Sequence, residues 1–206
     1  MDIHPLIYAH RGIWQTPDQQ NSRQSIEAAR FSGYGVETDF RSKNDSLVIS
    51  HDPYGDSNPL AVDEIDFAEI PVALNIKEDG LLTHYESFFR KYPSRRTFLF
   101  DGSIPEMVKI KEKGLPHALR LSEYETELPW EPQFLWIDGF HSDWWIKSPK
   151  ILNLIEKHFV VFVSPELHGR AIESAWEFFH FLYSKGITKF GICSDHPDKL
   201  KATFDE

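Results

Sequence analysis

Cysteine is nearly absent from this sequence, since Cys193 is the single cysteine among 206 residues. No disulfide can form within one chain, and a zinc site built from several cysteines is excluded. A chain without disulfides is compatible with a reducing compartment, so we expect the protein in the cytoplasm.

Long hydrophobic runs are also missing. The most apolar run covers only residues 159–163, whereas a membrane-spanning helix needs about 20 apolar residues. Residues 5–9 form the apolar stretch before the first charged pair, which is too short for the core of a signal peptide. We therefore expect no stable association with a membrane.

Positive charge is scarce. Lys and Arg number 22 against 32 Asp and Glu, which gives a formal net charge of −10. This balance excludes a general nucleic-acid binder and docking by charge on anionic lipids. Apolar residues make up 41% and charged residues 26%, as in ordinary globular proteins. The length fits one domain of roughly 150 to 200 residues, so residues 1–206 are predicted to form a single domain.

Short apolar segments recur along the whole chain, and most are followed by a stretch with helical spacing. The expected strands are residues 6–9, 35–40, 72–76, 97–100, 117–121, 134–137, 159–163 and 189–193. The expected helices are residues 22–31, with Ser22 as N-cap, 81–92, 104–113, 149–157 and 170–184. Continuous apolar character, rather than alternation, is typical of parallel strands that are covered on both faces. Eight such units of about 26 residues predict an α/β fold, a small (β/α)₈ TIM barrel. A doubly wound open sheet is the alternative.

Two carboxylates interrupt the second expected strand. Glu37 and Asp39 lie two residues apart, which places them on the same face of an otherwise apolar segment. Two carboxylates on one face stay ionised only if a cation compensates them, and oxygen ligands favour Mg²⁺, Ca²⁺ or Mn²⁺. The alternative is an exposed strand edge with solvated carboxylates.

Basic and imidazole side chains follow the first expected strand and a later apolar run. His10 and Arg11 end the first strand, and His51 follows residues 47–49. A pair of histidines suits phosphoryl transfer, one accepting the proton of the nucleophile and one protonating the leaving oxygen. Arg11 offers a planar fork for phosphate oxygens, and Gly12 permits a sharp turn beside it. Taken alone, each histidine is more often a structural or surface residue.

These residues occur in a recognisable order. Residues 9–12 (Ala-His-Arg-Gly), Asn21, residues 35–39 (Gly-Val-Glu-Thr-Asp) and residues 48–52 (Val-Ile-Ser-His-Asp) follow one another. This order resembles the opening signature of the glycerophosphodiester phosphodiesterase family, a TIM-barrel branch of the phospholipase-C-like phosphodiesterases. The specific motifs cover about the first quarter of the chain, and residues 74–77 and 191–197 are compatible with the later strands.

The resemblance implies roles for the charged residues. His10 and His51 would form the acid–base pair, Glu37 and Asp39 would bind a divalent cation, and Arg11 would hold the phosphate. Lys77 is a second candidate for the phosphate, or else a solvated lysine.

The sequence departs from the family pattern at two positions. Gln20 stands where the family usually has Glu, and Asn75 stands where the family's third metal ligand is usually Glu. Asn75 is either a weaker oxygen ligand or an amide without a ligand role, and Asp101 is the alternative source of a third ligand.

The sequence thus predicts a metal-dependent phosphoric diester hydrolase. Its expected partner is a small glycerophosphodiester-like substrate, which it would convert to an alcohol and a phosphomonoester. Two alternatives stay open, namely a lyase that releases a cyclic phosphate and a catalytically weak barrel that binds phosphodiester or phospho-sugar ligands.

Overall fold

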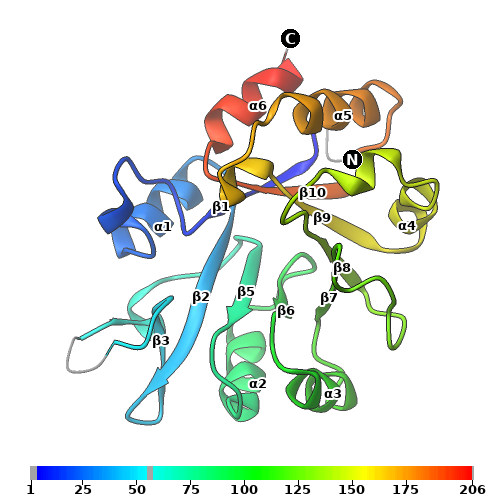
Figure 1. Ribbon diagram of the computed structural model, residues 1–206. Helices are drawn as coiled ribbons and strands as arrows, with labels where there is room; N and C mark the ends of the chain where they lie inside the picture. Colours follow the sequence, from blue (N-terminus) through cyan, green and yellow to red (C-terminus); the bar gives the residue numbers. More distant parts are fainter. Residues whose placement is uncertain (1–3, 55–57, 206) are drawn as a thin grey trace. The chain divides into compact units, whose positions relative to one another are not determined.

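The computed structural model describes residues 4–54 and 58–205 (Figure 1). The chain forms two compact units. The N-terminal unit comprises residues 9–117, and the C-terminal unit combines residues 118–206 with residues 1–8. Strand β1 (Leu6–His10) runs through the boundary, so that its last two residues belong to the N-terminal unit.

The N-terminal unit is built on a mixed sheet. Its strands are β2 (Gly35–Lys43), β3 (Ser46–Ile49), β4 (Leu60–Ala61), β5 (Val72–Ile76) and β6 (Phe98–Phe100). Strands β2, β5 and β6 are parallel neighbours, whereas β2, β3 and β4 pair in antiparallel fashion. The apolar strands therefore form the parallel part of the sheet, and the more polar end of β2 forms a hairpin.

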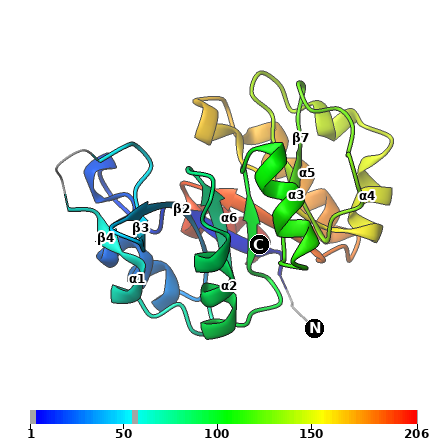
Figure 2. The same cartoon turned by 90° about the horizontal axis from the view of Figure 1, so that it is seen from below.

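Helices connect the strands of this unit. They are α1 (Arg23–Phe31), α2 (Leu82–Lys91) and α3 (Ile104–Glu112), with 3₁₀ turns η1 (Pro17–Gln19) and η2 (Val62–Glu64). The predicted N-cap of α1 is confirmed, because the Ser22 hydroxyl accepts a hydrogen bond from Ser25 N at 3.1 Å. Figure 2 shows α2 beside α3, where Glu86 and Lys113 form an ion pair at 3.3 Å.

An aromatic cluster fills the interior between the sheet and the helix α2. Phe40, Phe67 and Phe88 contact one another edge to face, with ring centroids 5.5 to 6.4 Å apart. Burial of such large apolar side chains is the main source of stability for this part of the unit.

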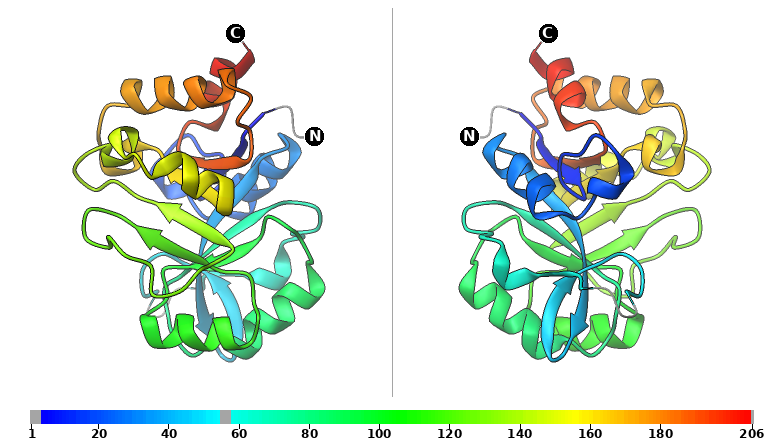
Figure 3. Two further views of the ribbon diagram at one scale, coloured as in Figure 1. Left: turned by 90° about the vertical axis from the view of Figure 1, so that its right-hand side faces the viewer. Right: turned by 90° about the vertical axis from the view of Figure 1, so that its left-hand side faces the viewer.

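The C-terminal unit has an all-parallel sheet in the order β7, β8, β9, β10. These strands are β7 (Ala118–Leu121), β8 (Phe134–Ile137), β9 (Phe159–Val163) and β10 (Phe190–Ser194). The helices are α4 (Ile151–Lys157), α5 (Glu173–Ser184) and α6 (Pro197–Asp205), with 3₁₀ turns η3 (Trp144–Lys147) and η4 (Pro165–His168). Figure 3 shows α5 and α6, in orange and red, side by side. In the core, the indole of Trp145 stacks on Phe179 at 5.4 Å.

The predicted strands are all present, and most of their ends agree within one residue. Strand β2 is longer than predicted, ending at Lys43 rather than residue 40, because its last residues pair with β3. Helix α6 was not predicted, since only Leu200 and Phe204 mark its buried face at helical spacing.

Candidate active site

The chain makes a tight turn directly after β1. Arg11 has φ 56° and Gly12 has φ 86°, both in the left-handed region. A side chain at Gly12 would be unfavourable for a second reason, because its Cβ would lie 2.5 Å from the carbonyl carbon of Ser25. The turn is held by Arg11 N, which donates to Glu37 O at 2.9 Å. It therefore brings Arg11 next to β2.

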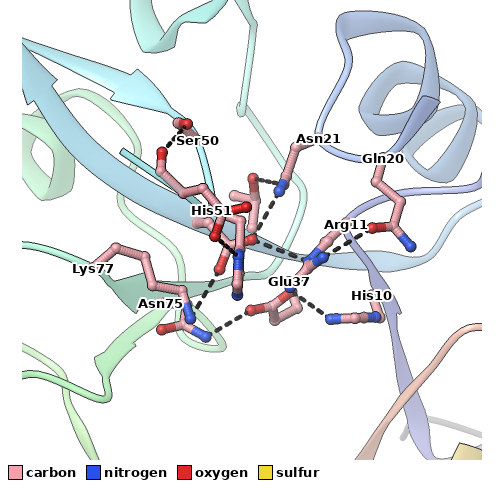
Figure 4. Close-up of polar contacts among 12 residues, drawn as sticks. His10, Arg11, Gln20, Asn21, Glu37, Ser50, His51, Asn75 and Lys77 are labelled. Atoms are coloured by element: carbon pink, nitrogen blue, oxygen red, sulfur yellow. Dashed lines mark hydrogen bonds and ion pairs between the residues drawn. The ribbon is translucent and has the colours of Figure 1, made fainter. Parts of the chain in front are cut away.

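Strand β2 carries the two predicted carboxylates into the interior. Glu37 and Asp39 are 2% and 0% exposed. In the register of the sheet Asp39 lies opposite Asn75 of β5, and Asn75 is buried as well. Because side chains alternate along a strand, Glu37 and Asp39 share one face, where Asn75 reaches Glu37 (Figure 4).

Asp39 has the most partners. Its Oδ2 lies 3.1 Å from Nε of Arg11 and accepts a hydrogen bond from Nδ2 of Asn21 at 2.7 Å. Its Oδ1 lies 3.3 Å from Nζ of Lys77. Two cations and an amide thus compensate the cost of burying this carboxylate. The structure places Lys77 against Asp39, whereas the sequence left open phosphate contact or a solvated lysine.

The cost of burying Glu37 is compensated by fewer neighbouring groups. Its Oε1 accepts a hydrogen bond from Nδ2 of Asn75 at 3.1 Å, and its Oε2 lies 3.8 Å from Nε2 of His10. Burial, followed by repulsion from Asp39, raises the pKa of Glu37 to about 7, although His10, Asn75 and Lys77 act in the opposite direction. A carboxyl group with this pKa can change its protonation state near neutral pH.

Two further residues belong to this cluster. The amide oxygen of Gln20 accepts a hydrogen bond from Nη1 of Arg11 at 2.8 Å. The side chain of Asn21 accepts from Thr38 Oγ1 at 2.8 Å while it donates to Asp39, so that it connects η1 to β2. Sequence reasoning noted both residues as motif positions but gave them no role. The one signal was Asn21 itself, because Asn tolerates the left-handed backbone (φ 57°) found there.

The remaining predicted residues are placed differently. The side chain of His51 is 44% exposed, and its Nδ1 lies 2.8 Å from Oδ1 of Asp52. Figure 4 shows His51 in the same close-up as Glu37 and His10. Asp101 follows β6 and is half-buried. Within residues 4–54 and 58–205, no three His, Cys, Asp or Glu side chains are grouped as a metal site, so Asp101 does not complete one with Glu37 and Asp39.

Oxygen atoms without a hydrogen-bond donor remain in this cluster. They are Oε2 of Glu37, Oδ1 of Asp39 and Oδ1 of Asn75, all buried. The contact of Asp39 Oδ1 with Lys77 is an ion pair without hydrogen-bond geometry. Two carboxylates and one amide oxygen form a donor set of the kind that Mg²⁺, Mn²⁺ or Ca²⁺ accepts. The residues therefore fit a divalent cation, with Asn75 as the third oxygen donor.

Comparison with known proteins gives matches in structure only. No family model and no curated protein matches the sequence. Among solved structures, glycerophosphodiester phosphodiesterase from Agrobacterium tumefaciens str. C58 is similar, with a TM-score of 0.69 and 16% sequence identity over 98% of this chain and 100% of that chain. A phosphodiesterase of Oleispira antarctica, in complex with its product sn-glycerol-3-phosphate, has a TM-score of 0.65 and 15% identity over 98% of each chain.

This likeness confirms the predicted fold class. The two solved structures are TIM barrels, and the chain shares their (β/α)₈ fold over nearly its whole length. Among the helices that the structure describes, none combines the length and the apolar character that crossing a membrane would require.

Proposed function

We propose that the chain is a phosphoric diester hydrolase that converts a glycerophosphodiester-like substrate to an alcohol and a phosphomonoester. The observation that carries the proposal is the cluster of His10, Arg11 and Lys77 around the buried carboxylates Glu37 and Asp39. A fold shared with two phosphodiesterases supports it.

The cations of the cluster account for binding of the substrate. Arg11 and Lys77 both contact Asp39, yet each has further N–H groups that can donate to phosphate oxygens. The acidic chain as a whole would repel an anion, so that local positive charge is needed at the site. We assign phosphate binding to Arg11 first and to Lys77 second.

We further propose that the reaction depends on Mg²⁺, Mn²⁺ or Ca²⁺. Glu37, Asp39 and Asn75 would hold the cation through the three oxygens that have no hydrogen-bond donor. A divalent cation there supplies positive charge that stabilises the developing charge on the phosphoryl oxygens.

Proton transfer is assigned to the two histidines. One imidazole accepts the proton of the attacking water, and the other protonates the oxygen of the departing alcohol as its bond to phosphorus breaks. Nε2 of His10 lies 3.8 Å from Oε2 of Glu37, and Nδ1 of His51 lies 2.8 Å from Oδ1 of Asp52. One nitrogen of each ring thus lies near a carboxylate.

The histidine assignment is tested by comparing two substrates. His10→Ala and His51→Ala are assayed with glycerophosphocholine and with an aryl phosphodiester, whose leaving group departs without a proton. The variant that lacks the general acid loses far more activity on glycerophosphocholine than on the aryl ester, and the variant that lacks the base loses both. Full turnover by both variants would contradict the two-histidine assignment.

The products distinguish hydrolysis from the alternatives. Phosphorus NMR of the reaction with added divalent cation is expected to show a phosphomonoester as the first product. A cyclic phosphate would instead identify a lyase. Binding of glycerol 3-phosphate without any turnover would identify a ligand-binding barrel, which Asn75 in place of a carboxylate would favour.

The composition of the chain indicates the compartment and the kind of substrate. We propose action in the cytoplasm on a free small molecule, since the chain has one cysteine and a net charge of −10.

A further inference from the structure

Arg11 is held in place by its backbone. Its N–H donates to Glu37 O at 2.9 Å, and its carbonyl oxygen accepts from Asn21 N and from Ser25 Oγ, both at 3.0 Å. These bonds lock a left-handed conformation that is unfavourable for Arg by itself. The starting point of the side chain is therefore fixed at the end of β1.

The guanidinium group is hydrogen-bonded at Nη1 and forms an ion pair at Nε, which has no hydrogen-bond partner. Nε faces Oδ2 of Asp39 at 3.1 Å, and Nη1 donates to the amide oxygen of Gln20 at 2.8 Å (Figure 4). Gln20 is itself anchored, since its N–H donates to Pro17 O at 3.2 Å at the end of η1. Among the residues that the structure describes, Nη2 has no partner.

The side chain at position 20 determines how much of the positive charge of Arg11 is compensated by neighbouring groups. An amide oxygen accepts one hydrogen bond and adds no negative charge, whereas a carboxylate would form a second ion pair with Arg11. Asp39 is already one anionic partner, and it is shared with Lys77. With a neutral residue 20, the guanidinium is restrained while its positive charge stays available to an anion.

We propose that Gln20 is the positioning residue for Arg11. It holds the guanidinium so that Nη2, together with the second N–H of Nη1, faces the non-bridging oxygens of a phosphate ester. It does so without reducing the attraction between Arg11 and the phosphate. This inference rests on the proposed function in one respect, because it takes Arg11 to be the residue that binds the phosphate.

Two substitutions distinguish the restraint that Gln20 places on Arg11 from the effect of charge at position 20. Gln20→Leu removes the acceptor, and Gln20→Glu keeps an acceptor but adds a negative charge. Gln24→Leu is the matched control, since Gln24 is an exposed glutamine on α1. Thermal denaturation of each variant checks that the fold is intact before binding is compared.

The readout is binding of glycerol 3-phosphate and inorganic phosphate by calorimetry, with the side-chain N–H signals of Arg11 followed by NMR. Gln20→Leu is expected to weaken phosphate binding about tenfold and to abolish the restrained Nη signals. Gln20→Glu is expected to keep those signals and still weaken binding about tenfold, and to raise KM more than it lowers kcat. Gln24→Leu is expected to match the wild type.

Binding within twofold of the wild type for Gln20→Leu, with unchanged Arg11 signals, would overturn the inference. Failure of the proposed function is a different result, namely wild-type protein that binds phosphate but hydrolyses no phosphodiester. In that case the binding and NMR measurements still decide the role of Gln20.

Discussion

Two acidic side chains, Glu37 within β2 and Glu123 just after β7, have different environments in the two units. Glu37 of the N-terminal unit has one amide donor, and its Oε2 has no hydrogen-bond donor. Glu123, which follows β7 in the C-terminal unit, accepts from the backbone N–H groups of Phe140, His141 and Ser142. Glu37 can therefore still accept a ligand, whereas the hydrogen bonds of Glu123 hold a loop in place.

The pKa values express the same difference. Burial raises the pKa of Glu37 to about 7, and repulsion from Asp39 adds to it. Burial also pushes the pKa of Glu123 upward, but hydrogen bonds from the loop outweigh it and lower that pKa to about 2. A carboxylate whose ionised form is left under-compensated is typical of a functional site, and one that is fully hydrogen-bonded is typical of a structural role.

The largest expected effect is on turnover. Glu37→Gln is expected to lower kcat/KM at least about a thousandfold, because it would remove the proposed cation ligand and the carboxylate beside His10. Steady-state assays on glycerophosphocholine measure this. Glu123→Gln, assayed below its melting temperature, is the control and should retain turnover within a few-fold; a similar loss in both variants would remove the contrast between the units.

A substitution of Asn75 tests whether the cluster around Glu37, unlike the region of Glu123, binds a cation. Asn75→Glu adds a third carboxylate, so affinity for Mn²⁺ is expected to rise about tenfold or more. Without the cation, the same variant should be less stable than the wild type, since the hydrogen bond to Glu37 is replaced by repulsion. Calorimetric titration with Mn²⁺ and melting with and without chelator test both parts. An unchanged affinity would indicate that residue 75 is not a ligand.

The structural role of Glu123 is tested by measuring the free energy of unfolding. Glu123→Gln is expected to lower the free energy of unfolding by about 1–2 kcal/mol at pH 7, since charge-assisted bonds to the loop become neutral ones. The folded-state pKa lies below the unfolded value of 4.5, so this contribution is present above about pH 4.5 and is lost as pH falls toward 2. Urea unfolding of both proteins at pH 7 and pH 3 measures it, and a difference that did not shrink at pH 3 would contradict this explanation.

Glu37 gives the opposite dependence of stability on pH. Its folded-state pKa lies above 4.5, so the folded state gains a proton between pH 4.5 and 7, and burial of Glu37 costs stability as pH rises through that range. In metal-free protein, Glu37→Gln should therefore gain about 2–3 kcal/mol relative to the wild type between pH 5 and pH 8. Urea unfolding in chelator at both pH values provides the comparison. A constant difference between the two proteins would mean that Glu37 stays ionised.

Much of the fold could be predicted because its strands are short, apolar and regularly spaced. The strand β4 and the helix α6 could not, since two-residue β4 carries almost no pattern and α6 has few clear apolar positions. The carboxylates of β2 were visible because charge inside a buried strand is rare.

The site was predictable where it depends on strands and less so where it depends on loops. Alternation along β2 placed Glu37 and Asp39 on one face, and the register of β5 brings Asn75 to it. The contact of Gln20 with Arg11 depends on the left-handed turn after β1, which no pattern in the sequence indicates. Asp101 was a candidate from its strand end alone, whereas Asn75 contacts Glu37 and has a buried oxygen without a hydrogen-bond donor.

We propose that the buried oxygens of Glu37, Asp39 and Asn75 that have no hydrogen-bond donor bind a divalent cation on which turnover depends. Titration of Mn²⁺, followed by electron paramagnetic resonance alongside turnover, tests it most directly in wild type, Glu37→Gln and Glu123→Gln. We expect one Mn²⁺ site per chain that is retained in Glu123→Gln, lost in Glu37→Gln, and required for activity. Equal Mn²⁺ binding in all three proteins, or turnover that persists in chelator, would contradict it.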